Sequence, residues 1–433
     1  MPNRKSWVIC SLLAIACFLI YYPIFSHTFL RGWDDGWMVL NRYTEHGFTV
    51  ENIKAIFTQS HGGQYAPFNQ LLYTTIRMLF GYNPSVYHLS NLLWHIANAC
   101  IVFLLIKNTL VYSRRAETTT AHYVALFASL LFAVHPLQVE SVAWISASKT
   151  LLYSFFTLLA LLAYIRYVHT LKAIWYVVSF ILFLFSCGCK EQAVVFPVCL
   201  FLFDWIMHRD LKKVEYWLEK IPFFLLALII GLYTLSLQNP EYVEKWAGYS
   251  FWQRIIFASY AIVEYLTKLV VPVKLMYLYP FPVAPGGDIP IRFFIYPVII
   301  LLLGVCLYVY RKQWPLIAGV LFFGINIFLT VHIVPMSRYA IVADRYVYLS
   351  SVGIFFIMAW YVWHYVRTLT KKYKIWCGIA VFFYLVYLGG YAHVRTKVWY
   401  NDDTLKQELR DLLEQRNRME NIPTSGETSG SES

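Results

Sequence analysis

Long apolar runs separated by short basic connectors dominate the sequence. Runs of about 18 or more apolar residues predict membrane-spanning helices. We expect spans near 7–26, 87–106, 121–135, 150–168, 173–188, 193–207, 220–237, 291–310, 314–331, 350–366 and 375–391. The runs are continuous, whereas a β-barrel would show short alternating segments. The pattern therefore predicts an all-α integral membrane protein with about eleven transmembrane helices.

The basic connectors orient these helices. They lie at 107–115, 166–172, 209–220, 311–312 and 367–374, and the positive-inside rule places such segments in the cytoplasm. If 255–272 crossed the membrane, the last two connectors would face outward. That segment also carries Glu264 and Lys268, which are costly at the bilayer centre. We therefore predict an interfacial or re-entrant helix there, with the N-terminus inside. The alternative is twelve spans with both ends inside.

Composition narrows the class of protein. The 433 residues are 59% hydrophobic and 14% charged, with a mean hydropathy of +0.53, whereas a soluble protein has roughly 25% charged residues. The net charge of +12 falls in clusters between apolar runs, which argues against a nucleic-acid partner and for a lipid bilayer. Most of the eight cysteines lie inside apolar runs, so buried free thiols are expected.

Two regions follow from this topology. Residues 1–398 form a polytopic membrane domain with an extended first outer loop at 27–86, and 399–433 form a short tail without tetratricopeptide repeats. The tail ends in the low-complexity stretch TSGETSGSES, which predicts disorder. The other outer segments are 136–149, 189–192, 238–290 and 332–349, and they carry most of the unusual polar residues.

The first outer loop contains the acidic motif RGWDDGWMV. Asp34 and Asp35 stand side by side near the membrane face, where a carboxylate can act as a general base or help to bind a divalent cation. The alternative is that one of them only caps the following helix. The polar, Gly-rich stretch 60–70, which includes His61, is typical of the rim of a site.

Two further outer segments carry candidate anion-binding residues. In HPLQVESVAWISASK, Glu140 and Trp144 fit one short helical face, and Lys149 begins the next span. Lys149 is either a membrane anchor or, since it lies outward against the charge rule, a binding group for an anion. Lys190 and Glu191 form a polar break between two apolar runs. They either neutralise each other in a turn or contribute to the site.

The segment VPMSRYAIVADRYVYLSSVG contributes two arginines. Asp344 is placed to cap the span that follows, but Arg345 opposes the helix dipole there unless an anion binds it. The planar fork of an arginine suits the oxygen pair of a phosphate, so Arg338 and Arg345 are candidates to bind one. The outer face thus combines carboxylates in one loop with cations in three others.

These stretches resemble the GT-C superfamily of glycosyltransferases, and most closely the membrane portion of the transmembrane and tetratricopeptide-repeat protein O-mannosyltransferases and their bacterial relatives. The resemblance rests on WDDGWMVLN, SVYHLSNLLWHIANACIVFLL, HPLQVESVAWISASKTLLYSFFTLLALLAYIRY, PVKLMYLYPFP and ADRYVYLSSVG, which occur in the family's order across most of 28–355. It implies a GT-C-like fold and an inverting transfer of a sugar, such as mannose, from a polyprenyl-phosphate donor to a hydroxyl on a protein or glycan.

The resemblance also implies roles for residues. The family's acidic motif falls on Asp34 and Asp35, which would orient or deprotonate the acceptor and sometimes support a metal. No cofactor is required, although a divalent cation at these aspartates stays open. The implied phosphate-binding residues are Lys149, Lys190, Arg345 and Arg338. The residues expected to fix the surrounding loops are His135, Glu140, Glu191, Asp344 and His61.

The sequence also departs from the family. Ala66 precedes Pro67 where eukaryotic members carry arginine, and Glu191 follows Lys190 where many bacterial relatives carry proline. A flippase for the same lipid and an O-antigen ligase-like enzyme are the alternative functions. The near absence of glycosylation sequons favours the bacterial inner membrane over the endoplasmic reticulum, with the site on the periplasmic or lumenal side.

Overall fold

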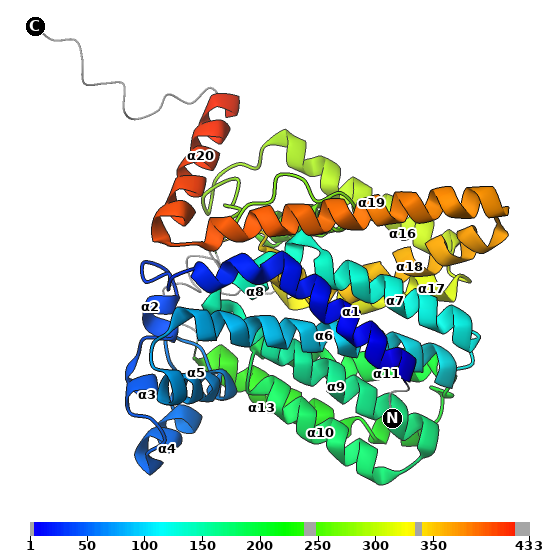
Figure 1. Ribbon diagram of the computed structural model, residues 1–433, viewed down its shortest axis with the longest axis horizontal. Helices are drawn as coiled ribbons and strands as arrows, with labels where there is room; N and C mark the ends of the chain where they lie inside the picture. The colour runs from blue at the N-terminus through cyan, green and yellow to red at the C-terminus, as the bar shows by residue number, and fades with distance from the viewer. Residues whose placement is uncertain (1–3, 238–247, 334–339, 421–433) are drawn as a thin grey trace, which may run out of the picture.

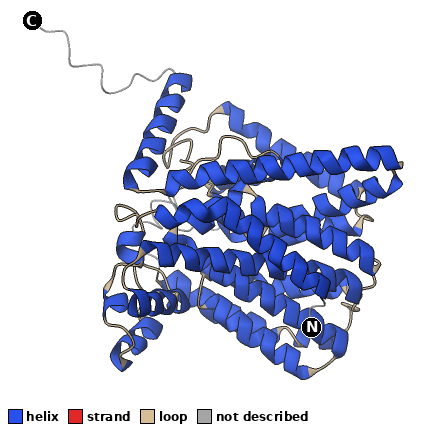
Figure 2. Ribbon diagram, in the orientation of Figure 1, coloured by secondary structure: helices blue, strands red, loops and turns tan. Residues whose placement is uncertain are grey.

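The protein is all-helical in the part of the chain that the computed structural model describes, residues 4–237, 248–333 and 340–420. Helices and loops make up the ribbon diagram (Figure 2). Within these residues, extended pairing is limited to two isolated bridges, His61 with Gln64 and Tyr279 with Val342. The predicted all-α fold class is confirmed.

Every predicted span contains a helix. These helices are α1 (Arg4–Tyr21), α6 (Pro84–Tyr112), α7 (Thr118–Val134), α9 (Ser148–Thr170), α10 (Ala173–Cys187), α11 (Phe196–Ile206), α13 (Ile221–Ser236), α16 (Ile295–Val309), α17 (Trp314–Ile327), α18 (Ser351–Thr368) and α19 (Lys371–Thr396). Figure 1 shows most of them running lengthwise through one bundle.

Fewer of these helices are long enough to cross a membrane unaided. Six helical stretches of the described chain have the length and composition of a span, and the bent pair Thr118–Val134 with Pro136–Ala143 makes a seventh. The apolar stretches Ala173–Cys187 and Trp314–Thr330 are shorter, and α11 has 11 residues, whereas a crossing helix needs about 20. The predicted number of eleven transmembrane helices therefore stays a prediction.

One end of the bundle gathers the basic connectors, and we call it the basic end. The Arg115 guanidinium lies over the rings of Trp205 and Trp314, 5.9 and 4.8 Å from their centroids. Three other contacts join segments at this end: Lys107 to Ser6 at 3.0 Å, Tyr112 stacked on His169 at 4.1 Å, and Arg367 to Thr120 at 3.0 Å. The start of α1 lies there too (Figure 1). This is the arrangement that the connector charges predicted.

The segment predicted to be interfacial or re-entrant forms α15 (Phe251–Val270). The Tyr384 hydroxyl, midway along α19, donates to the Val270 carbonyl at 2.7 Å, and Arg395, near the end of α19, donates to the Leu275 carbonyl at 2.7 Å. These α19 residues are eleven apart, which is roughly 16 Å of helix. The chain after α15 therefore turns back from mid-bundle toward the end opposite the basic connectors. This geometry supports the re-entrant interpretation.

Short helices build that opposite end, which we call the motif end because it holds the acidic motif. They are α2 (Asp35–Met38), α3 (Arg42–Glu45), α4 (Val50–Thr58), α5 (Pro67–Phe80), η2 (Pro136–Gln138), α8 (Val139–Ala143), η3 (Ile145–Ala147), η4 (Glu191–Val195), η7 (Asp344–Val347), η8 (Lys397–Trp399) and α20 (Asp402–Glu420). Local signals start several of them. Asn41 and Thr44 exchange capping hydrogen bonds at α3, and Pro67 opens α5.

The bundle has a buried centre and an apolar exterior. The spans Pro84–Tyr112 and Ile145–Thr170 are 56% and 61% buried, whereas Val214–Ser236 and Ile291–Val309 are 11% and 6% buried. Exposed leucines and isoleucines cover the peripheral helices. A contiguous apolar exterior of this size suits contact with lipid, so α6 and α9 form the core and α13 and α16 face the bilayer.

Candidate functional site

The two aspartates of the acidic motif lie in different environments. Asp35 is 0% exposed, and its carboxylate accepts hydrogen bonds from the Leu30 N–H at 2.9 Å and from the N–H and hydroxyl of Ser146. Asp34 is half-buried and accepts from the indole N–H of Trp37 at 3.3 Å. Asp34 is at the N-cap position of α2, but its side chain makes no capping hydrogen bond. Asp35 thus anchors the motif to η3, and Asp34 is its accessible carboxylate.

The environment of Asp35 does not suit a metal ligand. Burial raises the pKa of Asp35 to about 6, although hydrogen bonds from Ser146 and Leu30 lower it. Those donors occupy the lone pairs that a divalent cation would need. Within the described residues, no three His, Cys, Asp or Glu side chains form a group that could hold a metal ion. The aspartate pair therefore does not fit the divalent-cation site considered from the sequence.

The loop 60–70 borders the acidic motif, as the sequence predicted. The His61 Nε2 lies 2.7 Å from the Trp37 carbonyl, and Lys149 donates from Nζ to Gln64. A cavity of about 30 Å³ opens beside them. It is lined by Trp37, Met38, Tyr43, Ile56, Gln59, His61, Gln64, Ala66, Pro67, Asn69 and Gln70. Trp37, which lines the cavity, contacts both Asp34 and His61. The cavity therefore lies next to the acidic motif.

Glu140 holds Arg345 beside the acidic motif. One Glu140 oxygen accepts from the Arg345 guanidinium, and the other accepts from the Arg345 backbone N–H at 2.7 Å. The guanidinium lies 5.2 Å from the ring centroid of Trp144 and 4.8 Å from that of Tyr346. The side chain of Arg345 is 22% exposed and that of Glu140 is 1% exposed. The anion that offsets the helix dipole at Arg345 is therefore Glu140, as part of the protein itself.

Asp34 and Arg345 are brought to the same turn of the chain. Asp35, next to Asp34, accepts from the Ser146 N–H at 3.0 Å, and the Arg345 guanidinium lies 5.2 Å from the ring centroid of Trp144, two residues before Ser146. Burial lowers the pKa of Arg345, but the charge of Glu140 raises it, and the net shift is upward. The acidic motif and the 332–349 segment, which are about 300 residues apart in the chain, thus meet in one site. Asp34 and Arg345 are partly accessible charges of opposite sign, and each is positioned by a buried group, Ser146 through Asp35 for Asp34 and Glu140 for Arg345.

Lys190 lies on the same aromatic surface as Arg345. Its Nζ donates to the Thr150 hydroxyl at 2.9 Å and lies 5.9 Å from the ring centroid of Tyr346, which also contacts Arg345. Lys190 is buried at 4% exposure. Glu191 is half-buried and begins η4. The structure therefore brings Lys190 and Arg345 together around Tyr346, whereas Lys149 donates to Gln64 of the 60–70 loop.

Asp344 occupies a buried charge network next to Arg345. It is 0% exposed and accepts from the Tyr279 hydroxyl at 3.1 Å. Its other oxygen lies 3.6 Å from Arg395. Burial raises the pKa of Asp344, although the charge of Arg395 lowers it. The N-cap position of η7 is Ala343 and that of the following helix α18 is Ser350, so Asp344 serves as an ion-pair partner and not as the predicted helix cap.

His135 and Arg338 complete the list of predicted site residues. The His135 Nδ1 accepts from the Leu137 N–H at 3.2 Å, and its ring packs against Phe355. His135 thus fixes the turn between α7 and α8, which is consistent with a role in holding the loops. Arg338 lies outside the described residues.

Sequence reasoning missed Arg395, Trp37 and Tyr346, although each contacts a predicted site residue. Arg395 lies in the last turn of an apolar helix, where a basic residue is also expected as a snorkelling or dipole-complementing group. Trp37 and Tyr346 are two among many aromatic residues, which make up 19% of the chain. The sequence therefore gives no signal that distinguishes them from the others.

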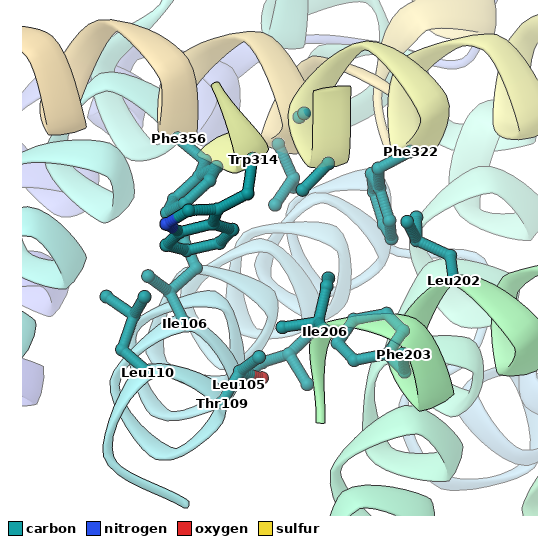
Figure 3. Close-up of a pocket in the computed structure, with 14 residues that line it drawn as sticks. Leu105, Ile106, Thr109, Leu110, Leu202, Phe203, Ile206, Trp314, Phe322 and Phe356 are labelled. Atoms are coloured by element: carbon teal, nitrogen blue, oxygen red, sulfur yellow. The ribbon is translucent and has the colours of Figure 1, made fainter. Parts of the chain in front are cut away.

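An apolar cavity lies far from these charges. It has a volume of about 60 Å³ and lies among α6, α11, α17 and α18 (Figure 3). Trp314, which lines it, also contacts Arg115 at the basic end. Apart from Thr109, the labelled side chains around it are apolar. This cavity offers no group for acid–base or phosphate chemistry.

Sequence comparison identifies two curated relatives. The chain is similar to protein O-mannosyl-transferases. Protein O-mannosyl-transferase Tmtc3 of Drosophila melanogaster is 26% identical over 231 residues, 46% of this chain and 23% of that protein. Protein O-mannosyl-transferase TMTC3 of Homo sapiens is 31% identical over 139 residues, 31% of this chain and 14% of that protein. No family model matches the chain. The resemblance seen in the motifs is confirmed, and the match spans less than a quarter of either relative.

One solved structure is similar at the level of chain trace. ArnT from Cupriavidus metallidurans bound to undecaprenyl phosphate aligns with a TM-score of 0.42 and 14% sequence identity, over 92% of this chain and 76% of that chain.

Proposed function

We propose that the protein is a membrane glycosyltransferase that transfers a sugar from a polyprenyl-phosphate donor to a hydroxyl on a protein or glycan. The observation that carries the proposal is that Asp34 and Arg345, two partly accessible charges of opposite sign, both lie beside the turn 144–146 at the motif end, the first through the bond of Asp35 to Ser146 and the second through its contact with Trp144. The similarity to protein O-mannosyl-transferases supports a hexose such as mannose and a protein acceptor.

Asp34 is the proposed general base. It is half-buried, and its neighbour Asp35 fixes the backbone of the motif through three hydrogen bonds. In an inverting transfer, the acceptor oxygen bonds to the anomeric carbon while the bond from that carbon to the phosphate oxygen breaks. The acceptor proton goes to Asp34, and such a base contributes roughly 10²–10⁴-fold to the rate.

Arg345 is the proposed partner of the leaving phosphate, with Lys190 and Lys149 contributing positive charge nearby. Negative charge grows on the lipid phosphate as it leaves, and pre-oriented donors stabilise that charge best. Glu140 and Trp144 orient the Arg345 fork before the substrate arrives. Lys190 approaches the same region through Tyr346. Arg338 stays a candidate from sequence alone.

The alternatives predict different chemistry. A flippase for the same lipid would move the donor without breaking its sugar–phosphate bond, and a ligase-like enzyme would not need Asp34. In both alternatives the lysines and the arginine of the motif end would still matter for binding the lipid. Only the carboxylate of Asp34 therefore distinguishes the alternatives from the proposed transferase. The proposed setting is the periplasmic face of a bacterial inner membrane or the lumenal face of the endoplasmic reticulum, and nucleic acid is not a proposed partner.

The test is transfer in reconstituted vesicles. Purified protein is incorporated into liposomes with a radiolabelled polyprenyl-phosphate hexose and a mixture of protein and glycan acceptors. We expect labelled acceptor with wild type and with Glu51→Gln, a change at an exposed acidic residue of the same loop. We expect at least about a 100-fold loss with Asp34→Asn. Donor that crosses the bilayer without transfer indicates the flippase, and full transfer by both Asp34→Asn and Asp35→Asn overturns the mechanism.

A further inference from the structure

The chain that follows α19 returns to the motif end and contacts both halves of the candidate site. This segment, 396–408, contains η8 and the first turns of α20. In Figure 1, α20 projects from the bundle next to the end of α19. The sequence suggested only a tail here. Its contacts fall into three sets, one with the acidic motif, one with Trp144 beside Arg345, and one with Arg395 beside Asp344.

The first set fixes the loop that carries Asp34. Both carboxylate oxygens of Asp402 lie 3.1 Å from the Gly32 N–H, and the Tyr400 carbonyl accepts from the Thr28 N–H at 3.0 Å. A Cβ atom at Gly32 would lie 3.3 Å from the Asp402 carboxylate, tighter than an ordinary contact. The loop therefore packs closely against Asp402 at Gly32, which lies two residues before the proposed base Asp34.

The second set reaches Arg345 by a stack of aromatic rings. The rings of Trp399 and Trp144 are 5.5 Å apart and 18° from parallel, and the Arg345 guanidinium lies 5.2 Å from the Trp144 centroid. Trp399 is 1% exposed, so its position is fixed by packing. Trp144 therefore lies in contact with both Trp399 and the guanidinium.

A third contact reaches the residue before Arg345. Glu408 accepts from Arg395 at 3.2 Å, and Arg395 lies 3.6 Å from Asp344. The same 13-residue segment thus touches the motif loop through Asp402, the Arg345 stack through Trp399, and the Asp344 network through Glu408.

We propose that 396–408 is a positioning segment that fixes the separation between the Asp34 loop and Arg345, with Asp402 as its principal positioning residue. This inference rests on the proposed function, because the separation matters only if one substrate spans the two charges. A displacement of about 1 Å can cost roughly 100-fold in rate when two reacting groups must be held in line. Asp402 acts on the Asp34 loop through its hydrogen bond with the Gly32 N–H.

The test compares four variants by transfer kinetics in vesicles and by hydrogen–deuterium exchange of residues 28–38. Asp402→Ala removes the acceptor, and Asp402→Asn keeps one acceptor oxygen without the charge. Gly32→Ala crowds the contact from the loop side. Asp403→Ala, at an exposed neighbouring position on α20, is the matched control. Thermal unfolding establishes that each variant is folded.

We expect Asp402→Ala and Gly32→Ala to lower kcat by about tenfold or more while the donor KM changes little, and to raise exchange in 28–38. Asp402→Asn should recover part of the rate, and Asp403→Ala should match wild type. The positioning role is overturned if the wild type is active and Asp402→Ala matches the control Asp403→Ala in both kcat and hydrogen exchange. A wild type without transfer contradicts the proposed function instead, and the exchange comparison still decides whether Asp402 holds the loop.

Discussion

Two groups of charged residues lie at opposite ends of the bundle and differ in how completely their charges are paired. At the basic end, Asp204, Arg209, Glu219 and Lys220 form a closed cluster. Arg209 lies 3.2 Å from Asp204 and 2.7 Å from Glu219, and Lys220 lies 3.4 Å from Glu219. Lys220 also pairs with Asp204, and both are 0% exposed.

The motif end is more open. Arg345 is 22% exposed and Glu219 of the closed cluster is 21% exposed, but Glu219 is bound by Arg209, Lys220 and Tyr167. Asp34 is half-buried and accepts a hydrogen bond from the Trp37 indole. The approach of Arg395 to Asp344, 3.6 Å, is beyond hydrogen-bonding distance. The closed cluster has two charges of each sign and satisfies itself, whereas the motif end presents charge that a substrate can use. Pairing, and not the number of charges, therefore distinguishes the candidate site from a structural cluster.

The largest expected effect comes from opening the closed cluster. Lys220→Met leaves Asp204 buried without its lysine partner, which should destabilise the protein by about 3–5 kcal/mol. Transfer per folded molecule should be unchanged. Denaturant unfolding in detergent measures the first quantity and the vesicle assay the second. Lys212→Met, at an exposed position of the same connector, is the control. A loss of transfer with unchanged stability would assign the cluster a direct functional role.

The next effect concerns the buried aspartate of the motif. Asp35→Asn replaces one acceptor oxygen by an amide that faces the Leu30 or Ser146 donors, and a buried unsatisfied group costs about 1–3 kcal/mol. The midpoint of unfolding should fall, and transfer should decline less than in Asp34→Asn. If Asp35→Asn abolishes transfer without a change in stability, the roles of the two aspartates are reversed.

A smaller effect is expected at Arg345. Arg345→Lys keeps the positive charge next to Glu140 but loses the planar fork. We expect transfer to fall by about tenfold, ~1.4 kcal/mol in the barrier, with little change in stability. Arg42→Lys, at an exposed arginine of α3, provides the comparison. Wild-type rates in Arg345→Lys would show that a point charge is enough and that the phosphate is not held by the fork.

The smallest effect is a pH dependence of stability. The pKa of Asp35 in the folded protein is about 6, above its ordinary value of 3.8, so folding takes up a proton between these values. The contribution of Asp35 to the free energy of unfolding therefore rises as the pH falls from 6 to 4, by at most about 1.4 kcal/mol per pH unit. As the pH is lowered from 7 to 6 and then to 5, the Tm of wild type should rise relative to that of Asp35→Asn. Parallel pH profiles in the two proteins would contradict the raised pKa.

The sequence predicted the positions of the helices well, because helix positions depend on local properties. Apolar runs located the helices, and the charge of the connectors predicted that 255–272 turns back without crossing, as the contacts of Val270 and Leu275 with α19 support. The motif also identified Asp34 and Asp35, since two adjacent carboxylates are unusual beside an apolar run.

The pairings could not be predicted, because they join residues far apart in the chain. Arg345 pairs with Glu140 at a separation of 205 residues, and Gly32 binds Asp402 at 370. Periodicity carries no information about such partners. The closed cluster was missed for the same reason: Asp204 ends an apolar helix and Lys220 begins another, and each alone resembles a membrane anchor.

The central claim is that Asp34 does the chemistry while Asp35 supports the motif. The most direct measurement is the single-turnover rate of sugar transfer in vesicles, with donor bound at saturation, for wild type, Asp34→Asn and Asp35→Asn. We predict that Asp34→Asn slows this step by at least about 100-fold with unchanged stability, and that Asp35→Asn retains most of the rate in its folded fraction. Equal single-turnover rates for Asp34→Asn and wild type would contradict the claim.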